Sequence, residues 1–127
     1  MIVVDTSALI AIFRGEPEAE SFLQLLLDTP ALISAPSRLE AFVVVTRRHG
    51  DEKASELGAV IADLKLTTVA FDEELTELAE QAFRRYRRGR HGLNYGDCFS
   101  YALAKARDLP LLFKGEDFAA TDVKRAV

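Results

Sequence analysis

Short apolar runs alternate along the chain with segments in which apolar residues recur every three or four positions. Four of the runs have the length of a buried strand, at residues 1–4, 31–34, 66–71 and 111–113. The first run has no polar face and is rich in β-branched residues, which is typical of a central parallel strand covered on both faces. The alternation of strand-like and helix-like segments predicts an α/β fold.

The intervening segments predict six helices. The third, from Pro36 to the stop signal at Gly50, contains the strand-prone residues 41–45, but start and stop signals at helical distance favour a helix. The other helices are expected after a cap at Thr6 or Ser7, from Pro17, after caps at Asp51 and Asp72, and over residues 94–108. We therefore expect a single domain, residues 1–127, with a central parallel sheet of four or five short strands covered by helices on both faces.

Composition narrows the class of protein. Apolar residues make up 49% of the chain and charged residues 28%, the balance of a folded soluble protein. No run approaches membrane-spanning length, and the first residues lack the basic start of a secretory leader. The single cysteine, Cys98, excludes an internal disulfide and fits a reducing compartment. We therefore expect a cytoplasmic protein without a membrane partner.

Acidic side chains follow the predicted strands or open the predicted helices. Asp5 follows the first strand, Glu40 lies just inside the third helix, and Asp97 lies in the first turn of the sixth. The acids after the last strand are Glu116, Asp117 and Asp122. Because such points share one edge of a parallel sheet, we expect these carboxylates to meet in one crevice. Crowded carboxylates stay ionised beside a divalent cation, and oxygen-only ligands suit Mg²⁺ or Mn²⁺ better than zinc.

Each acid also has a local structural explanation. Asp5 can cap the helix that follows it, and Asp97 can complement the dipole of its own helix. Glu40 lies three residues after Ser37, which is the spacing of a capping box. The acids after the last strand can be turn residues. The coincidence of their placement favours a shared site over separate caps.

Several segments together resemble a PIN domain, and more narrowly the VapC-type ribonuclease toxins of bacterial type II toxin–antitoxin pairs. These segments are residues 2–9, Glu40, residues 92–104 and residues 111–122. The resemblance covers essentially the whole chain in order, and residues 94–104 are its most specific part. It implies a Mg²⁺-dependent endoribonuclease that is neutralised by a cognate VapB-type antitoxin, with a homodimer and toxin–antitoxin hetero-oligomers as the expected assemblies.

The resemblance also implies roles for the acids. Asp5 and Asp97 would be the principal ligands of Mg²⁺, for which Mn²⁺ can substitute, and Glu40 would be the third catalytic acid. Many PIN domains place a fourth acid where this chain has Gly115. Here one of the acids that follow must supply it, and we favour Asp117.

Polar neighbours of these acids have two possible roles. A hydroxyl of Thr6 or Ser7 could orient Asp5 or the attacking water, and Asn94 could support Asp97 in the same way. Helix capping is the commoner use of all three residue types.

Arginines gather between Arg84 and Arg90, although the net charge of the chain is -4. One guanidinium group can donate two parallel hydrogen bonds to the oxygens of a phosphate. Arg85, Arg88 and Arg90 are therefore candidates for contact with an RNA backbone. The alternative is a solvated helix end whose cations complement the dipole, and for Arg84 and Arg85 the two explanations are evenly balanced.

A different class of function is a PIN-like module that binds RNA or a protein partner without cutting. Such a module has no need of a complete set of acids. We therefore favour the nuclease, and comparing the wild type with an Asp97→Asn variant distinguishes the two.

Overall fold

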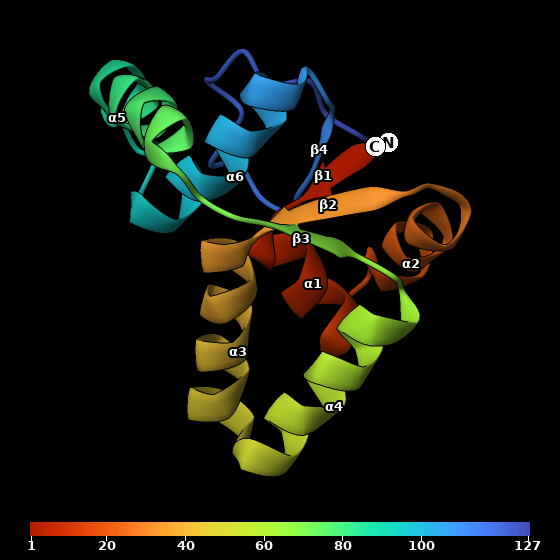
Figure 1. Ribbon diagram of the computed structural model, residues 1–127. Coiled ribbons are helices and arrows are strands. Elements are labelled where there is room, and N and C mark those ends of the chain that lie inside the picture. Colours follow the sequence, from red (N-terminus) through yellow and green to blue (C-terminus); the bar gives the residue numbers. More distant parts are fainter.

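Four parallel strands form the central sheet of the computed structural model, which describes residues 1–127 (Figure 1). The strands are β1 (Ile2–Val4), β2 (Ala31–Ser34), β3 (Thr67–Val69) and β4 (Leu111–Leu112). Their order in the sheet is β3-β2-β1-β4. In the central strand β1, Val3 pairs with Leu32 on one side and with Leu111 on the other. All three pairings are parallel, so the carboxyl ends of the strands share one edge.

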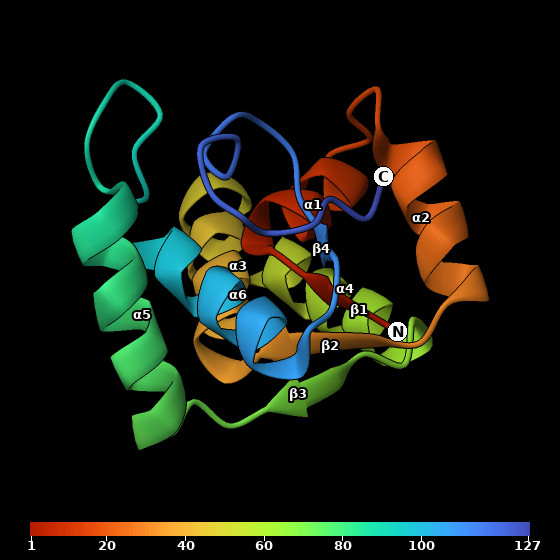
Figure 2. The same ribbon diagram turned by 90° about the horizontal axis from the view of Figure 1, so that it is seen from above.

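Helices cover both faces of this sheet. They are α1 (Thr6–Phe13), α2 (Ala19–Asp28), α3 (Ala35–His49), α4 (Asp51–Asp63), α5 (Glu73–Tyr86) and α6 (Tyr95–Arg107). Ile2 and Val4 of β1 join the hydrophobic cluster of α1 to α4, and Val3 joins that of α5 and α6, since alternate side chains of a strand face opposite ways. Figures 1 and 2 show α1 to α4 on one side and α6 lying over the strands on the other. The predicted α/β architecture is confirmed.

The edge strand β3 is shorter than the predicted run over residues 66–71. It pairs only with β2, and its residues Thr67 and Thr68 are exposed. Leu66 and Phe71 are apolar because they pack against the two hydrophobic clusters, not because they extend the strand. None of the six helices is long and apolar enough to cross a membrane.

The strand-prone residues 41–45 lie in the middle of α3, as the start and stop signals predicted. Ala41 and Val45 are buried in the cluster of α1 to α4, while Phe42 is 48% exposed. The packing of Ala41 and Val45 in the core therefore outweighs the local strand propensity of the segment. Only one face of this segment is therefore part of the core.

For α1, the predicted cap at Thr6 or Ser7 is wrong and the alternative cap at Asp5 is confirmed; for α3, the predicted capping box is wrong. The N-cap of α1 is Asp5, which accepts a hydrogen bond from the N–H of Ser7, and neither hydroxyl residue after it serves as the cap. The N-cap of α3 is Ser34, whose Oγ accepts from the N–H of Ser37 at 3.2 Å. Because Ser37 lies inside α3, it does not form the expected capping box with Glu40. That structural explanation for Glu40 is therefore removed.

Two other helices start at residues that differ from the prediction: α2 begins later, and α4 begins one residue earlier. The N–H of Ala19 donates to the carbonyl oxygen of Glu16 at 2.9 Å, so Pro17 lies in a turn before α2. The N-cap of α4 is Gly50, with φ of 90°, and Asp51 is the first helical residue. The cap at Asp72 is confirmed, since its side chain accepts from the N–H of Leu75.

Candidate active site

Asp5 lies at the carboxyl end of β1 and is only 4% exposed. Ser7 donates two hydrogen bonds to its Oδ2, from the backbone N–H at 3.0 Å and from Oγ at 2.6 Å. Ser100 donates to its Oδ1 at 2.5 Å from a position 95 residues away in the chain. Burial raises the pKa of Asp5, and the donors from Ser100 and Ser7 oppose that rise.

Asp97 lies in the first turn of α6 and is 7% exposed. It forms a reciprocal capping box with Asn94: the N–H of Asp97 donates to Asn94 Oδ1 at 2.9 Å, and the N–H of Asn94 donates to Asp97 Oδ2 at 3.0 Å. Burial and, to a smaller extent, the negative charges of Asp5, Asp117 and Glu40 together raise the pKa of Asp97 to about 7, although the hydrogen bond from Asn94 opposes the rise. The structure therefore brings the four predicted acids into one electrostatic neighbourhood around Asp97.

Glu40 reaches this neighbourhood from α3. A Cβ placed on Gly96 would lie 2.2 Å from Glu40 Oε2, so the carboxylate rests directly against the backbone of α6. Any larger residue at position 96 would force the Glu40 carboxylate to move away from α6. The local sequence around Asp97 gives no sign that Gly96 makes space for Glu40.

Of the acids after β4, Asp117 is the one whose charge acts on Asp97. Asp122 accepts a hydrogen bond from Tyr101 and pairs with Lys105 at 3.0 Å, and these contacts lower the Asp122 pKa. It therefore ties the C-terminal segment to α6. Glu116 is exposed and is not among the charges that act on Asp97. Asp117 as the fourth acid stays a prediction, which its effect on the pKa of Asp97 supports.

The two predicted support hydroxyls have different positions. Thr6 Oγ1 donates to the carbonyl oxygen of Ser37 at 3.0 Å, which ties α1 to α3. Ser7 Oγ donates to Asp5 and accepts from the N–H of Lys114 at 3.0 Å, which ties the segment after β4 to the same carboxylate. Only Ser7 contacts an acid of the site.

The predicted arginines lie at the end of α5 and in the loop before α6. Arg88 and Arg90 are exposed and make no ion pair. Arg85 is also exposed, with its guanidinium 5.1 Å from the ring centroid of Tyr86. Their contact with RNA stays a prediction.

The donor chemistry around Asp97 fits a hard divalent cation. None of Asp5, Glu40, Asp97 and Asp117 forms an ion pair with lysine or arginine, so their charge is not neutralised within the chain. No three or more histidine, cysteine, aspartate or glutamate side chains are grouped so that they could hold a metal ion. Mg²⁺ is commonly held by only one or two carboxylates and completes its octahedron with water, so Asp5 and Asp97 would be the residues to hold it.

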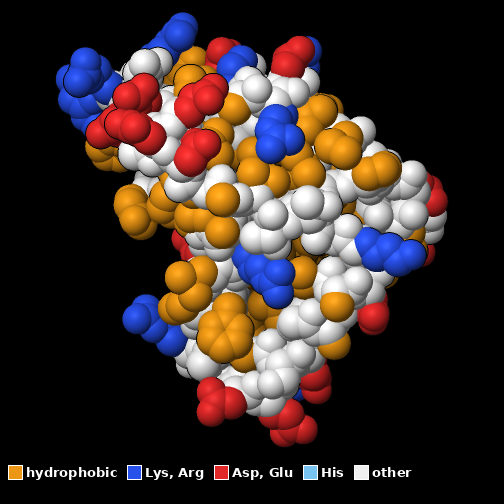
Figure 3. All heavy atoms as spheres, viewed as in Figure 1, with side chains coloured by type: hydrophobic (Ala, Val, Ile, Leu, Met, Phe, Trp, Pro, Cys, Tyr) orange, Lys and Arg blue, Asp and Glu red, His pale blue; other side chains and the backbone are white.

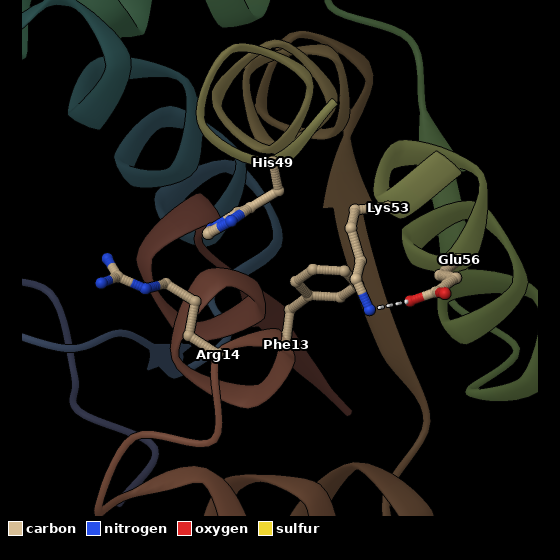
Figure 4. A pocket seen from close by; sticks show the side chains of 5 residues that line it. All are labelled: Phe13, Arg14, His49, Lys53 and Glu56. Atoms are coloured by element: carbon tan, nitrogen blue, oxygen red, sulfur yellow. Dashed lines mark hydrogen bonds and ion pairs between the residues drawn. The ribbon is translucent and has the colours of Figure 1, made fainter. Parts of the chain in front are cut away.

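Two surface pockets differ in their relation to the four acids. The pocket in Figure 4, at the far ends of α1 and α3, is lined by Phe13, Arg14, His49, Lys53 and Glu56 and contains none of the four acids. Lys53 there pairs with Glu56 at 3.1 Å. A groove between α3 and α6 does include Glu40, together with apolar residues and the 79% exposed Tyr95. Figure 3 shows hydrophobic side chains in the hollow between α5 and α3.

The raised pKa of Asp97 predicts how stability depends on pH. Between the unfolded value of 3.8 and the folded value of about 7, the native state binds more protons than the unfolded state, so the free energy of unfolding falls as pH rises. The raised pKa of Asp5 acts in the same direction. In EDTA, we expect the melting temperature to fall by roughly 5 °C from pH 5 to pH 8, measured by thermal denaturation.

Mg²⁺ is expected to restore more stability at pH 8 than at pH 5, because it binds the ionised carboxylates. An Asp97→Asn variant is the control and should show a flatter pH dependence. A melting temperature that rises from pH 5 to pH 8, or an unchanged slope in the variant, would contradict this assignment.

The sequence matches known proteins over nearly its whole length. The family model described as PIN domain matches residues 2–124. "Ribonuclease VapC" from Mycolicibacterium smegmatis (strain ATCC 700084 / mc(2)155) is 47% identical over 125 residues, which cover 96% of this chain and 97% of that relative.

Two solved structures share the fold. The crystal structure of Mycobacterium tuberculosis VapC20 (Rv2549c), described as a sarcin-ricin loop cleaving toxin, has a TM-score of 0.79 at 20% identity and covers 97% of this chain and 96% of that chain. VapBC2 from Rickettsia felis, bound to a DNA fragment from their promoter, gives a TM-score of 0.77 at 17% identity, with coverage of 98% and 96%.

A parallel sheet with acids at its carboxyl edge and helices on both faces defines an α/β protein of the PIN-like class. The chain belongs to the PIN domain family and, within it, to the VapC group. The resemblance stated from the sequence is confirmed.

Proposed function

We propose that this protein is the toxic component of a type II toxin–antitoxin pair, a Mg²⁺-dependent endoribonuclease that cleaves RNA phosphodiester bonds. The observation that carries the proposal is the buried Asp97, on which the charges of Asp5, Asp117 and Glu40 act, while none of these four acids has a cationic partner in the chain. The ribonuclease name of the 47% identical relative supports RNA as the substrate.

The four acids would have different roles, according to their positions. Asp5 and Asp97 would hold the ion, which lowers the pKa of a bound water and neutralises charge on the phosphate. Glu40 and Asp117, whose charges reach Asp97, would bind and orient the waters that complete the site. Ser7 keeps Asp5 hydrogen-bonded, and Asn94 fixes one oxygen of Asp97 through its backbone N–H. Mn²⁺ would substitute for Mg²⁺, because both accept oxygen ligands in an octahedron.

A negative site needs positive charge nearby to attract RNA. Arg88 and Arg90 are exposed and free of ion pairs, so their guanidinium groups are available to phosphate oxygens along the loop that leads to Asp97. Arg85 would extend this track from the last turn of α5.

The protein partner would be a VapB-type antitoxin. VapBC2 from Rickettsia felis, which has the same fold, is described as a complex bound to DNA from their promoter. A homodimer that joins such an antitoxin in a hetero-oligomer is the assembly that we propose for this chain.

The function is tested by inducing the chain in bacteria with and without the neighbouring reading frame, and by incubating the purified protein with labelled RNA. We expect growth arrest that co-expression of the neighbour relieves, and discrete RNA fragments in Mg²⁺. A non-cleaving RNA-binding module would retain intact RNA in a mobility-shift assay. RNA retention without fragments in Mg²⁺ would overturn the nuclease and support that alternative.

A further inference from the structure

Three buried serines connect the elements that carry the acids. Ser34 ends β2, Ser37 lies in the first turn of α3, and Ser100 lies in α6, and each is at most 1% exposed. Ser34 Oγ donates to Ser37 Oγ at 2.8 Å, and the Oγ atoms of Ser37 and Ser100 are 3.2 Å apart. The last link is the 2.5 Å hydrogen bond from Ser100 to Asp5. No buried side-chain polar atom of the chain lacks a hydrogen-bond partner, and these hydroxyls are no exception.

The direction of the whole chain follows from its last link. An ionised carboxylate can only accept, so the single hydroxyl hydrogen of Ser100 is committed to Asp5. Ser37 must then donate to Ser100, and Ser34 must donate to Ser37, as its geometry indicates. Ser34 in turn accepts from the backbone N–H of Ser37. The result is a one-way series of donors that ends on Asp5 Oδ1.

The positions of these serines relate them to the acids. Ser37 lies one helical turn before Glu40, and Ser100 lies one turn after Asp97, so each pair shares a face of its helix. The Ser37 to Ser100 contact therefore joins the two helices that carry Glu40 and Asp97. Hydrogen bonds in series also polarise one another, which favours a single orientation of the end group.

We infer that Ser34, Ser37 and Ser100 are positioning residues for catalysis, because their hydroxyl series fixes the Asp5 carboxylate relative to Glu40 and Asp97. The inference rests on the proposed function, since Asp5 matters here as a metal-holding acid. Partners behind a metal ligand orient it, and their loss commonly weakens metal binding about 10- to 100-fold. The serines do not touch the ion or the substrate in this assignment.

The test uses the purified full-length chain, with Mn²⁺ alone as the metal probe and labelled RNA as the substrate. We expect Ser100→Ala to raise the Mn²⁺ dissociation constant about 10-fold, measured by electron paramagnetic resonance, and to lower kcat at saturating Mg²⁺ by a similar factor. The KM for RNA should stay within about twofold, because no phosphate contact is lost. Ser100→Cys keeps the volume with a weaker donor and should show the same loss if the alanine variant does not fold.

A second pair of variants separates positioning from general packing. Ser37→Ala leaves the Ser100 to Asp5 bond in place, so we expect about a twofold effect. In a variant that combines Ser37→Ala with Ser100→Ala, Mn²⁺ affinity and kcat should be no lower than in Ser100→Ala alone. The reason is that Ser100→Ala already removes the hydrogen bond to Asp5. Ser55→Ala is the matched control on α4, where the exposed hydroxyl donates only to the Asp51 carbonyl oxygen.

Unchanged Mn²⁺ binding in Ser100→Ala, or additive losses in the double variant, would overturn the inference. A wild type that neither binds Mn²⁺ nor cuts RNA would instead remove the proposed function. The two failures are therefore distinguishable in one set of measurements.

Discussion

Replacing Asp97 by asparagine is expected to abolish RNA cleavage while leaving the fold intact. The amide has the shape of the carboxylate, and its oxygen can still accept from the N–H of Asn94, so the first turn of α6 is retained. It carries no charge for a cation. Loss of a partner behind a metal ligand costs 10- to 100-fold, so loss of a proposed ligand should lower kcat/KM by more than about 100-fold. Single-turnover cleavage of labelled RNA measures the loss, and circular dichroism checks the fold.

The same helix offers a matched control for this variant. Asp108 caps the other end of α6 with φ of 51°, a left-handed conformation that asparagine also tolerates. Its contact with Lys124, at 3.6 Å, is exposed and contributes little. Asp108→Asn should therefore cleave like the wild type. Equal growth arrest by the wild type and Asp97→Asn would disprove a catalytic role for Asp97.

Chelation of divalent metal is expected to stop cleavage almost completely, and Mg²⁺ or Mn²⁺ should restore it. The physical reason is that Asp5, Glu40, Asp97 and Asp117 present negative charge to a negative phosphodiester, and no lysine or arginine of the chain pairs with them. Zn²⁺ should restore little, because the cluster lacks the nitrogen and sulfur ligands that zinc favours. RNA fragments are counted in EDTA and after each metal is added in excess.

The control for chelation is EDTA presaturated with Mg²⁺, which should leave cleavage unchanged. RNA binding in EDTA is measured in parallel. It should persist, because the proposed contacts of Arg85, Arg88 and Arg90 with phosphate do not require the metal ion. Full cleavage in excess EDTA would exclude the metal-dependent mechanism while leaving family membership untouched.

Much of the site could be predicted from the sequence because parallel sheets place strand ends together. The placement of Asp5 after β1 and of Asp97 in the first turn of α6 follows from local apolar patterns and capping residues. The choice of Asp117 over Asp122 could not be decided that way. Only the folded chain shows that Tyr101 and Lys105 engage Asp122.

Local capping rules failed at the start of α3. The spacing of Ser37 and Glu40 predicted a capping box, but Ser34 caps α3 and Ser37 turns inward toward α6. The sequence of one helix does not show which other helix packs against it, so the contact of Ser37 with Ser100 of α6 could not be predicted. The same limit hid Ser100, whose partner is 95 residues away in the chain.

The sequence by itself determined the alternation of strands and helices, the parallel sheet and the set of acids, because these depend on periodicity and capping among neighbouring residues. The tertiary structure decided which acids share the neighbourhood of Asp97 and which hydroxyls orient Asp5. These outcomes depend on how α1, α3 and α6 pack at one sheet edge. Hydrogen bonds and electrostatic effects act over a few ångströms in space, whatever the separation along the chain.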